Sequence, residues 1–382
     1  MNILISILIG TVLGFIAGIV PGLHPNFLGA ILLSQFNDWW ILPSFVSMLV
    51  SAQFFEFIRS TFLFIPEEGN VLAMHPIFKF VEEGKSLAAI KLSIVGLLAA
   101  ILIGIILSPV LIKIVPIAYK ILKPYVPFIL LGVSGFLIAK DIKPLAALLI
   151  FLISGTVGYF GLKMLNQPLL ILLTGFFGFP IILQIKTKIP KQIKSYKYKI
   201  KKDSILRGSF AALLSSFLLT FIPAVGPSQA SLFSRGLLKK RDDFLISIGA
   251  ISGFDVVFSL ILLFSVGKAR IGVLEMLANR FTFDLNTLIF ALLLSVAVAL
   301  VAYLATLKIG LLFSKFSERL NYKYIAILVS ILIISVTLYF DGFVGILFLS
   351  SAIAIGVLAN KLKTRASHCM GSLVIPTLLF YL

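Results

Sequence analysis

The chain has 382 residues, of which 60% are hydrophobic and 13% charged, and its mean hydropathy is +1.12. Soluble domains carry roughly 25% charged residues, so this composition excludes an ordinary soluble domain and indicates a protein that crosses the membrane several times. The formal net charge of +18 does not indicate a nucleic-acid binder, because the lysines lie in loops between apolar runs, where basic residues set membrane orientation.

The first apolar segment, residues 10–26, combines a stripe of small residues with a proline break. Small residues fall at every fourth position, at Gly10, Gly14, Gly18 and Gly22. On a helix such positions share one face, where another backbone can approach closely. Proline cannot donate the helical hydrogen bond, and it pushes the preceding residue out of the α region. Pro21 and Pro25 therefore predict a break inside the apolar sequence.

Five apolar runs follow, each close to the roughly 17 to 25 residues that a membrane-spanning helix needs. They occupy 44–65, 86–112, 125–140, 144–162 and 168–185. The stretch Lys186–Lys202 then carries eight lysines and no acid. The positive-inside rule predicts that this stretch lies in the cytoplasm.

The broken segment recurs 202 residues later, at 212–228. Its small residues are Ala212, Ser216, Thr220 and Ala224, and its prolines are Pro223 and Pro227. Further apolar runs follow at 243–266, 284–308, 323–340, 342–359 and 369–382. The two series predict three parts: a first membrane repeat at 1–185, a basic cytoplasmic loop at 186–204 and a second membrane repeat at 205–382.

The charges that flank the two broken segments predict how they enter the membrane. Lysines precede the second one and Lys239, Lys240 and Arg241 follow it, so both of its ends are expected on the cytoplasmic side. The first has no lysine or arginine before Arg59, so it is expected to enter from outside. The sequence therefore predicts an all-α polytopic membrane protein of two inverted-topology repeats. Each repeat is a re-entrant helical hairpin, broken at proline and glycine, followed by about five transmembrane helices.

Three ionisable residues are expected inside the membrane, where a charge is costly and marks a candidate site. Glu56 and Arg59 follow the first hairpin; they are three residues apart and share a helix face. Asp255 lies in the corresponding span after the second hairpin, close to the register of Glu56. Two interpretations stay open for each residue: a buried structural contact, or contact with the substrate or with a coupling proton or sodium ion.

The chain restarts after each break with hydrogen-bonding side chains. A restarted half-helix offers free N–H groups and a partial positive charge, which suits an anion. The alternative is that Asn26 and Ser228 only cap their helices. The predicted substrate-binding residues are Pro21, Gly22, His24, Pro25, Asn26, Pro223, Gly226, Pro227, Ser228 and Gln229.

The sequence contains no pattern typical of an enzyme, a metal centre or a nucleotide site. The single cysteine and the three histidines lack metal-ligand spacing. The acids form no nucleophile and base arrangement, and no phosphate-binding loop of the G-x-x-x-x-G-K-[ST] type occurs. We therefore expect no catalytic residue, metal, cofactor or nucleic-acid partner.

The two breaks read PGLHP and PAVGP, and they resemble the Pro-Gly-Leu-Gly-Pro type signatures of the large membrane subunit of tripartite tricarboxylate transporters, the TctA family. The resemblance implies a secondary carrier of carboxylate-type organic anions, with the signatures lining the substrate site. Members of this family work with a small membrane partner subunit and an extracytoplasmic binding protein. His24 and Ala224 stand where the family pattern has glycine, and the chain looks like a short, divergent member.

We therefore expect a secondary transporter in the cytoplasmic membrane that holds a small organic anion between the two hairpins near the membrane midplane. Inverted repeats with re-entrant loops also resemble the polyprenyl-phosphate translocases, so a lipid phosphate in the same site is the alternative. The other expected partners are the lipid bilayer and either a small membrane subunit or a second copy of the chain.

Overall fold

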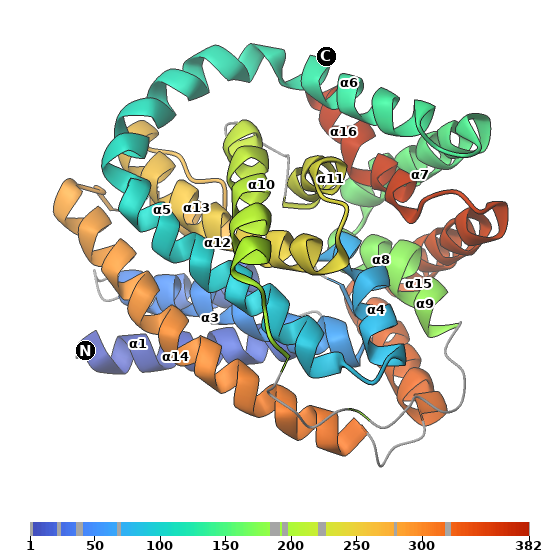
Figure 1. The fold of residues 1–382 in the computed structure, drawn as a ribbon, viewed down its shortest axis with the longest axis horizontal. Helices are drawn as coiled ribbons and strands as arrows, with labels where there is room; N and C mark the ends of the chain where they lie inside the picture. Colours follow the sequence, from blue (N-terminus) through green and yellow to red (C-terminus); the bar gives the residue numbers. More distant parts are fainter. Residues whose placement is uncertain are drawn as a thin grey trace.

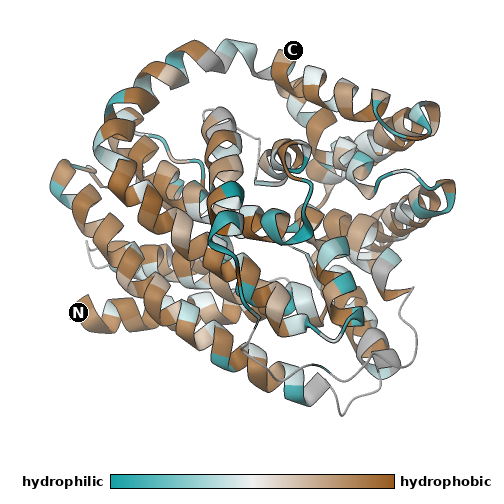
Figure 2. Cartoon of the chain, viewed as in Figure 1, coloured by the Kyte–Doolittle hydropathy of each residue, from teal (hydrophilic) through white to brown (hydrophobic). Residues whose placement is uncertain are grey.

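The computed structural model describes residues 3–20, 24–35, 41–66, 70–183, 192, 198–220, 227–278, 281–317 and 322–381. Within these ranges the chain is built from helices and no residue lies in a strand (Figure 1). Apolar residues cover most of the helices, and hydrophilic residues gather at helix ends and connections (Figure 2). This distribution agrees with the membrane protein that the composition predicts.

The described helices fall on either side of the basic stretch at 186–202. The first half contains α1 (Ile3–Ile19), α2 (Pro25–Gln35), α3 (Ile41–Phe62), η1 (Val71–Ala73), α4 (Met74–Glu82), α5 (Ser86–Leu122), η2 (Lys123–Tyr125), α6 (Val126–Ala139), α7 (Pro144–Met164), α8 (Pro168–Leu173), the π-helical η3 (Thr174–Gly178) and α9 (Phe179–Ile182). The second half contains α10 (Lys202–Thr220), α11 (Pro227–Leu237), α12 (Arg241–Val266), α13 (Gly272–Ala278), α14 (Leu285–Ser317), α15 (Tyr322–Leu362), η4 (Ala366–Met370) and α16 (Gly371–Tyr381).

Six of the described helices are long and apolar enough to cross a membrane, namely α3, α5, α7, α12, α14 and α15. The most apolar stretches of α3 and α12 are 94% and 100% buried inside the protein, whereas those of the other four are at most 44% buried. α3 and α12, the helices that follow the two broken segments, therefore form the centre of the molecule.

Three details differ from the predicted spans. The run expected at 86–112 continues as α5 to Leu122 and contains Pro109 and Pro116; membrane helices tolerate proline because neighbouring groups satisfy the freed backbone. The spans expected at 323–340 and 342–359 form α15, which is interrupted at Gly342 (φ 57°). The short helices α4 and α13 lie between spans and were not expected.

Small residues let α1 pack directly on α3, as the stripe at 10–18 predicts. A side chain at Gly10 would overlap the backbone of Ser44, and one at Gly18 would lie 2.7 Å from Cβ of Phe55. Near the start of both helices, the Ser6 and Ser44 hydroxyls lie 2.8 Å apart. α1 and α3 therefore run in the same direction, so α2 must return the chain between them.

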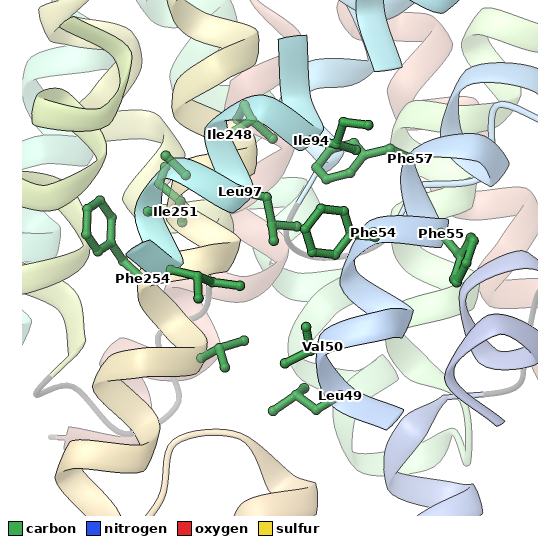
Figure 3. Packing of buried hydrophobic residues seen from close by; sticks show 14 of the residues in the cluster. Leu49, Val50, Phe54, Phe55, Phe57, Ile94, Leu97, Ile248, Ile251 and Phe254 are labelled. Atoms are coloured by element: carbon green, nitrogen blue, oxygen red, sulfur yellow. The ribbon is translucent and has the colours of Figure 1, made fainter. Parts of the chain in front are cut away.

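The largest helix contact joins the two halves, because α5 packs along α12. Gly96 and Gly104 of α5 face Ile246 and Val257, and Gly249 of α12 lies on the backbone of Ser93. Ser93 and Gly96 of α5 thus lie by Gly249 and Ile246 of α12, and the later Gly104 lies by the later Val257, so α5 and α12 are parallel. Figure 3 shows the core between the halves, in which Phe54 of α3, Leu97 of α5 and Ile251 of α12 belong to one buried cluster.

Ion pairs fix which helix ends lie together. Arg207, at the start of α10, pairs with Asp243 at the start of α12, with 2.7 Å between Nε and Oδ2. Arg241 pairs with Glu83, just before α5, with 2.7 Å between Nη1 and Oε1. The starts of α5, α10 and α12 therefore lie at one end of the molecule.

A second group of helices, α6 to α9 with α15 and α16, packs beside the central helices, and two aspartates cross-link it. Asp141, in the turn between α6 and α7, contacts Nε2 of His368 at 2.8 Å and accepts the N–H of Arg365 at 3.2 Å. Asp341, at the interruption of α15, accepts the backbone N–H groups of Asn166 and Gln167 before α8. Each of the two aspartates binds the segment before a helix of the other half of the chain.

Candidate functional site

Arg59 binds the end of α1, where the first break begins. Its Nη1 donates to the carbonyl oxygens of Ala17 and Val20 at 3.2 and 3.4 Å, and the residue is 1% exposed. The last carbonyl groups of a helix lack partners within the helix. A buried guanidinium from α3 therefore supplies hydrogen bonds that lipid cannot. Glu56 lies one turn earlier on α3 and is also buried.

The restart after the first break contacts the second half of the chain. His24 directly precedes α2, and Asn26 lies in its first turn. The backbone N–H of Asn26 donates a hydrogen bond to Nδ1 of His24 at 3.2 Å. The Asn26 amide lies against the backbone of Gly272, where an added Cβ would be 2.6 to 2.9 Å from the amide atoms. Oδ1 of Asn26 is buried and has no hydrogen-bond partner within the described ranges. The start of α2 therefore places a polar side chain against the second half of the chain.

Asp255 pairs with Arg270, a residue that the sequence analysis missed. Oδ1 of Asp255 lies 3.2 Å from Nη1 of Arg270, and both side chains are 8% exposed. Arg270 lies in the connection between α12 and α13, two residues before Gly272, so the ion pair neighbours the Asn26 contact. A charge stands out in the sequence when it lies within an apolar span, and Arg270 lies outside the apolar spans.

The register of the acids also needs a correction. The 202-residue offset pairs Asp255 with Gln53, which lies three residues before Glu56. Residues three apart share a helix face, so the polar groups of α3 and α12 lie on corresponding faces rather than at identical positions. Oε1 of Gln53 is buried without a hydrogen-bond partner in the described part of the chain.

Part of the predicted site lies outside the described residues, namely Pro21, Gly22, Pro223 and Gly226. Pro227 begins α11, and Ser228 and Gln229 lie in its first turn. Further along α11, Ser234 bonds to Ser247 of α12 at 2.6 Å. The expectation that the two breaks meet near the midplane stays a prediction. Among the described residues, no group of three or more His, Cys, Asp or Glu side chains is arranged to hold a metal ion.

Six long apolar helices, with the buried charges of Arg59, Asp255 and Arg270 among them, are compatible with a membrane transporter. A model of the tripartite tricarboxylate transporter TctA family matches residues 4–371. The chain therefore belongs to the TctA family, which confirms the resemblance of the two proline-rich breaks. It is also similar to the uncharacterized protein MJ1079 of Methanocaldococcus jannaschii, with 30% identity over 383 residues that cover 94% of each chain. No solved structure matches the chain.

Proposed function

We propose that this protein is a secondary transporter of a small organic anion of the carboxylate class. The observation that carries the proposal is the junction of the halves, where Asn26 at the restart of a broken helix lies against Gly272, beside the buried pair of Asp255 and Arg270. A polar, charged site between two repeats is where secondary transporters bind substrate. Membership of a tricarboxylate transporter family supports the same reading.

The proposal includes two inverted repeats. The rings of Phe62 and Phe313 lie 5.8 Å apart at the ends of α3 and α14, and Gly310 of α14 lies near Ile90 at the start of α5. α3 therefore ends where α12 begins, and the two central helices run in opposite directions. This arrangement supports an inverted copy, with one re-entrant hairpin entering from each side of the membrane.

Coupling and partners belong to the same proposal. Glu56 and Asp255 are the buried acids that a coupling proton or sodium ion would meet, because a buried carboxylate favours a cation. The protein acts in the cytoplasmic membrane, with the Lys186–Lys202 stretch inside, and with a small membrane subunit or a second copy of the chain. The family match favours this carrier over the polyprenyl-phosphate translocase, for which no comparison gives support.

A thermal-shift experiment on the purified protein tests the proposal. A ligand that binds only the folded state stabilises it by about 2.7 kcal/mol at a concentration one hundred times its dissociation constant. We expect citrate or a smaller carboxylate to raise the unfolding temperature, and polyprenyl phosphate to leave it unchanged. Stabilisation by polyprenyl phosphate with no effect of any carboxylate would replace the carrier by the lipid translocase.

A further inference from the structure

We propose that Arg270 binds a carboxylate of the transported anion, and that the anion displaces Asp255 from it. The inference rests on the proposed function and assigns the charge that recognises the substrate. It concerns the connection between α12 and α13, outside both proline-broken segments.

The ion pair leaves hydrogen-bonding capacity unused. Oδ1 of Asp255 faces Nη1 of Arg270, whereas Nη2 of Arg270 is buried and has no hydrogen-bond partner among the described residues. A guanidinium normally grips a carboxylate through two parallel N–H groups. The Arg270 side chain instead contacts Asp255 through Nη1 at 3.2 Å. Its Nη2 is therefore available to a second carboxylate.

The surroundings of Arg270 also favour a ligand. Oδ1 of Asn26 is another buried polar atom without a partner in the described ranges, and its amide contacts Gly272, two residues from Arg270. Buried polar groups are almost always hydrogen-bonded, and unsatisfied ones need an explanation. Of these atoms, Nη2 of Arg270 is the donor, and a carboxylate oxygen of a bound anion would satisfy it.

A purely structural pair would behave differently. Breaking a buried ion pair by removing one partner leaves an uncompensated charge and is destabilising. If Asp255 serves only to neutralise Arg270, removing its charge should harm the protein and leave any anion site unaffected. If Asp255 competes with the substrate for Arg270, removing its charge should tighten anion binding. The two readings therefore predict different results for the same substitution: unchanged anion affinity if the pair is only structural, and tighter anion binding if Asp255 competes with the substrate.

The experiment measures citrate binding to the purified full chain by calorimetry, with succinate and acetate as smaller probes. Asp255→Asn keeps the shape of the side chain and removes the competing charge. We expect it to bind citrate roughly 10- to 100-fold more tightly, the range of one hydrogen bond to a charged group. Adding Arg270→Gln to Asp255→Asn makes the pair neutral. We expect this double variant to lose the gain in citrate affinity and to bind citrate at least roughly 100-fold more weakly than Asp255→Asn.

A matched control neutralises an ion pair far from the site. The double variant Glu83→Gln with Arg241→Gln removes the exposed pair between the starts of α5 and α12, and its affinity for citrate should equal that of the natural protein. If the Asp255→Asn/Arg270→Gln protein does not fold, Asp255→Asn alone decides by the sign of its effect.

The outcomes separate this inference from the proposed function. If the natural protein binds citrate and Asp255→Asn binds it equally or more weakly, Arg270 is a structural residue and the inference fails while the carrier stands. If neither the natural protein nor Asp255→Asn binds any of the three carboxylates, the inference and the proposed substrate class both fail.

Discussion

The two buried arginines near the first hairpin do different work because their partners differ. Nη1 of Arg59 donates to the main-chain carbonyl groups of Ala17 and Val20 at the end of α1. Arg270 faces a single carboxylate and keeps an open N–H group. We propose that Arg59 holds the end of α1 and that Arg270 binds the substrate.

Replacing Arg59 by glutamine is expected to destabilise the protein. The carbonyl oxygens of Ala17 and Val20 lose a charged donor in the protein interior, and hydrogen bonds to charged groups are worth about 1.5 to 3 kcal/mol. Unfolding in urea measures the loss. Arg241→Gln is the control, since exposed ion pairs contribute only about 0 to 1 kcal/mol. Equal stability of the two variants would mean that Arg59 does not hold the end of α1.

The sequence predicts some of the site residues and not others. Glu56, Arg59 and Asp255 stand out because a charge inside an apolar run is costly. Arg270 does not stand out, because it lies in a connection with ordinary polar composition. Its contact with Asp255 forms only when the chain folds. For the same reason no pattern indicated that Asp141 of one half would meet His368 of the other.

Among the helices, close packing depends on glycine wherever a backbone lies against another. Gly10 and Gly14 of α1 and Gly96 and Gly249 at the contact of α5 with α12 all lack the space for a side chain. Membrane helices gain little from apolar burial against each other, so such close contacts supply much of their association.

Substituting Gly10 by alanine should therefore lower stability, although alanine is the better helix former. The new methyl group would overlap the carbonyl group of Ser44, and overpacking costs about 1 to 3 kcal/mol. Gly132→Ala in α6 is the matched control, because nothing lies within 4 Å of its added methyl group and helix propensity alone should raise stability by up to about 1 kcal/mol. Thermal unfolding of both variants measures the two changes in stability. If both variants were stabilised, or both destabilised, the packing argument would be wrong.

The contact of Asp141 with η4 predicts an acid dependence of stability. Burial alone would raise the pKa of the Asp141 carboxyl, but hydrogen bonds from the Lys143 N–H, from His368 and from the Arg365 N–H lower it below the usual 3.8. A depressed pKa contributes stability above the usual value, and this contribution is lost as the pH falls through the lowered pKa. Asp141→Asn should therefore lose less stability than the natural protein on acidification below about pH 4. Unfolding temperatures of the natural protein and of Asp141→Asn, measured along a pH series, test this prediction. Parallel curves for the two proteins would show that the Asp141 carboxylate does not contribute to stability.

Hydropathy predicts the positions and order of the apolar segments, because each spanning helix must be apolar over the thickness of the bilayer. It predicts ten spans, whereas six of the described helices are long and apolar enough to cross a membrane. It does not predict the short helices α4 and α13, which lie between the spans, or the length of α5. Proline suggested an end near residue 112, but a proline within the bundle only bends or weakens a helix whose neighbours satisfy the freed groups.

For the whole molecule, the packing of each half against the other sets the sidedness. The turn containing Ile142 and the connection containing Lys268 should face opposite sides of the membrane, with Ile142 on the side of the basic loop. A membrane-impermeant thiol reagent tests this on cells, after Cys369 is replaced by alanine. Lys268→Cys should react in intact cells and Ile142→Cys only after permeabilisation. Labelling of both in intact cells would contradict the inverted arrangement.

The central claim is that the chain carries an organic anion across the membrane, and citrate counterflow tests it most directly. Proteoliposomes loaded with unlabelled citrate are diluted into a trace of labelled citrate, so a carrier exchanges the two without any coupling gradient. The account predicts label uptake above protein-free liposomes, abolished by excess unlabelled citrate outside, and retained in the Glu83→Gln/Arg241→Gln control. Folded protein that exchanges neither citrate nor any smaller carboxylate would contradict it.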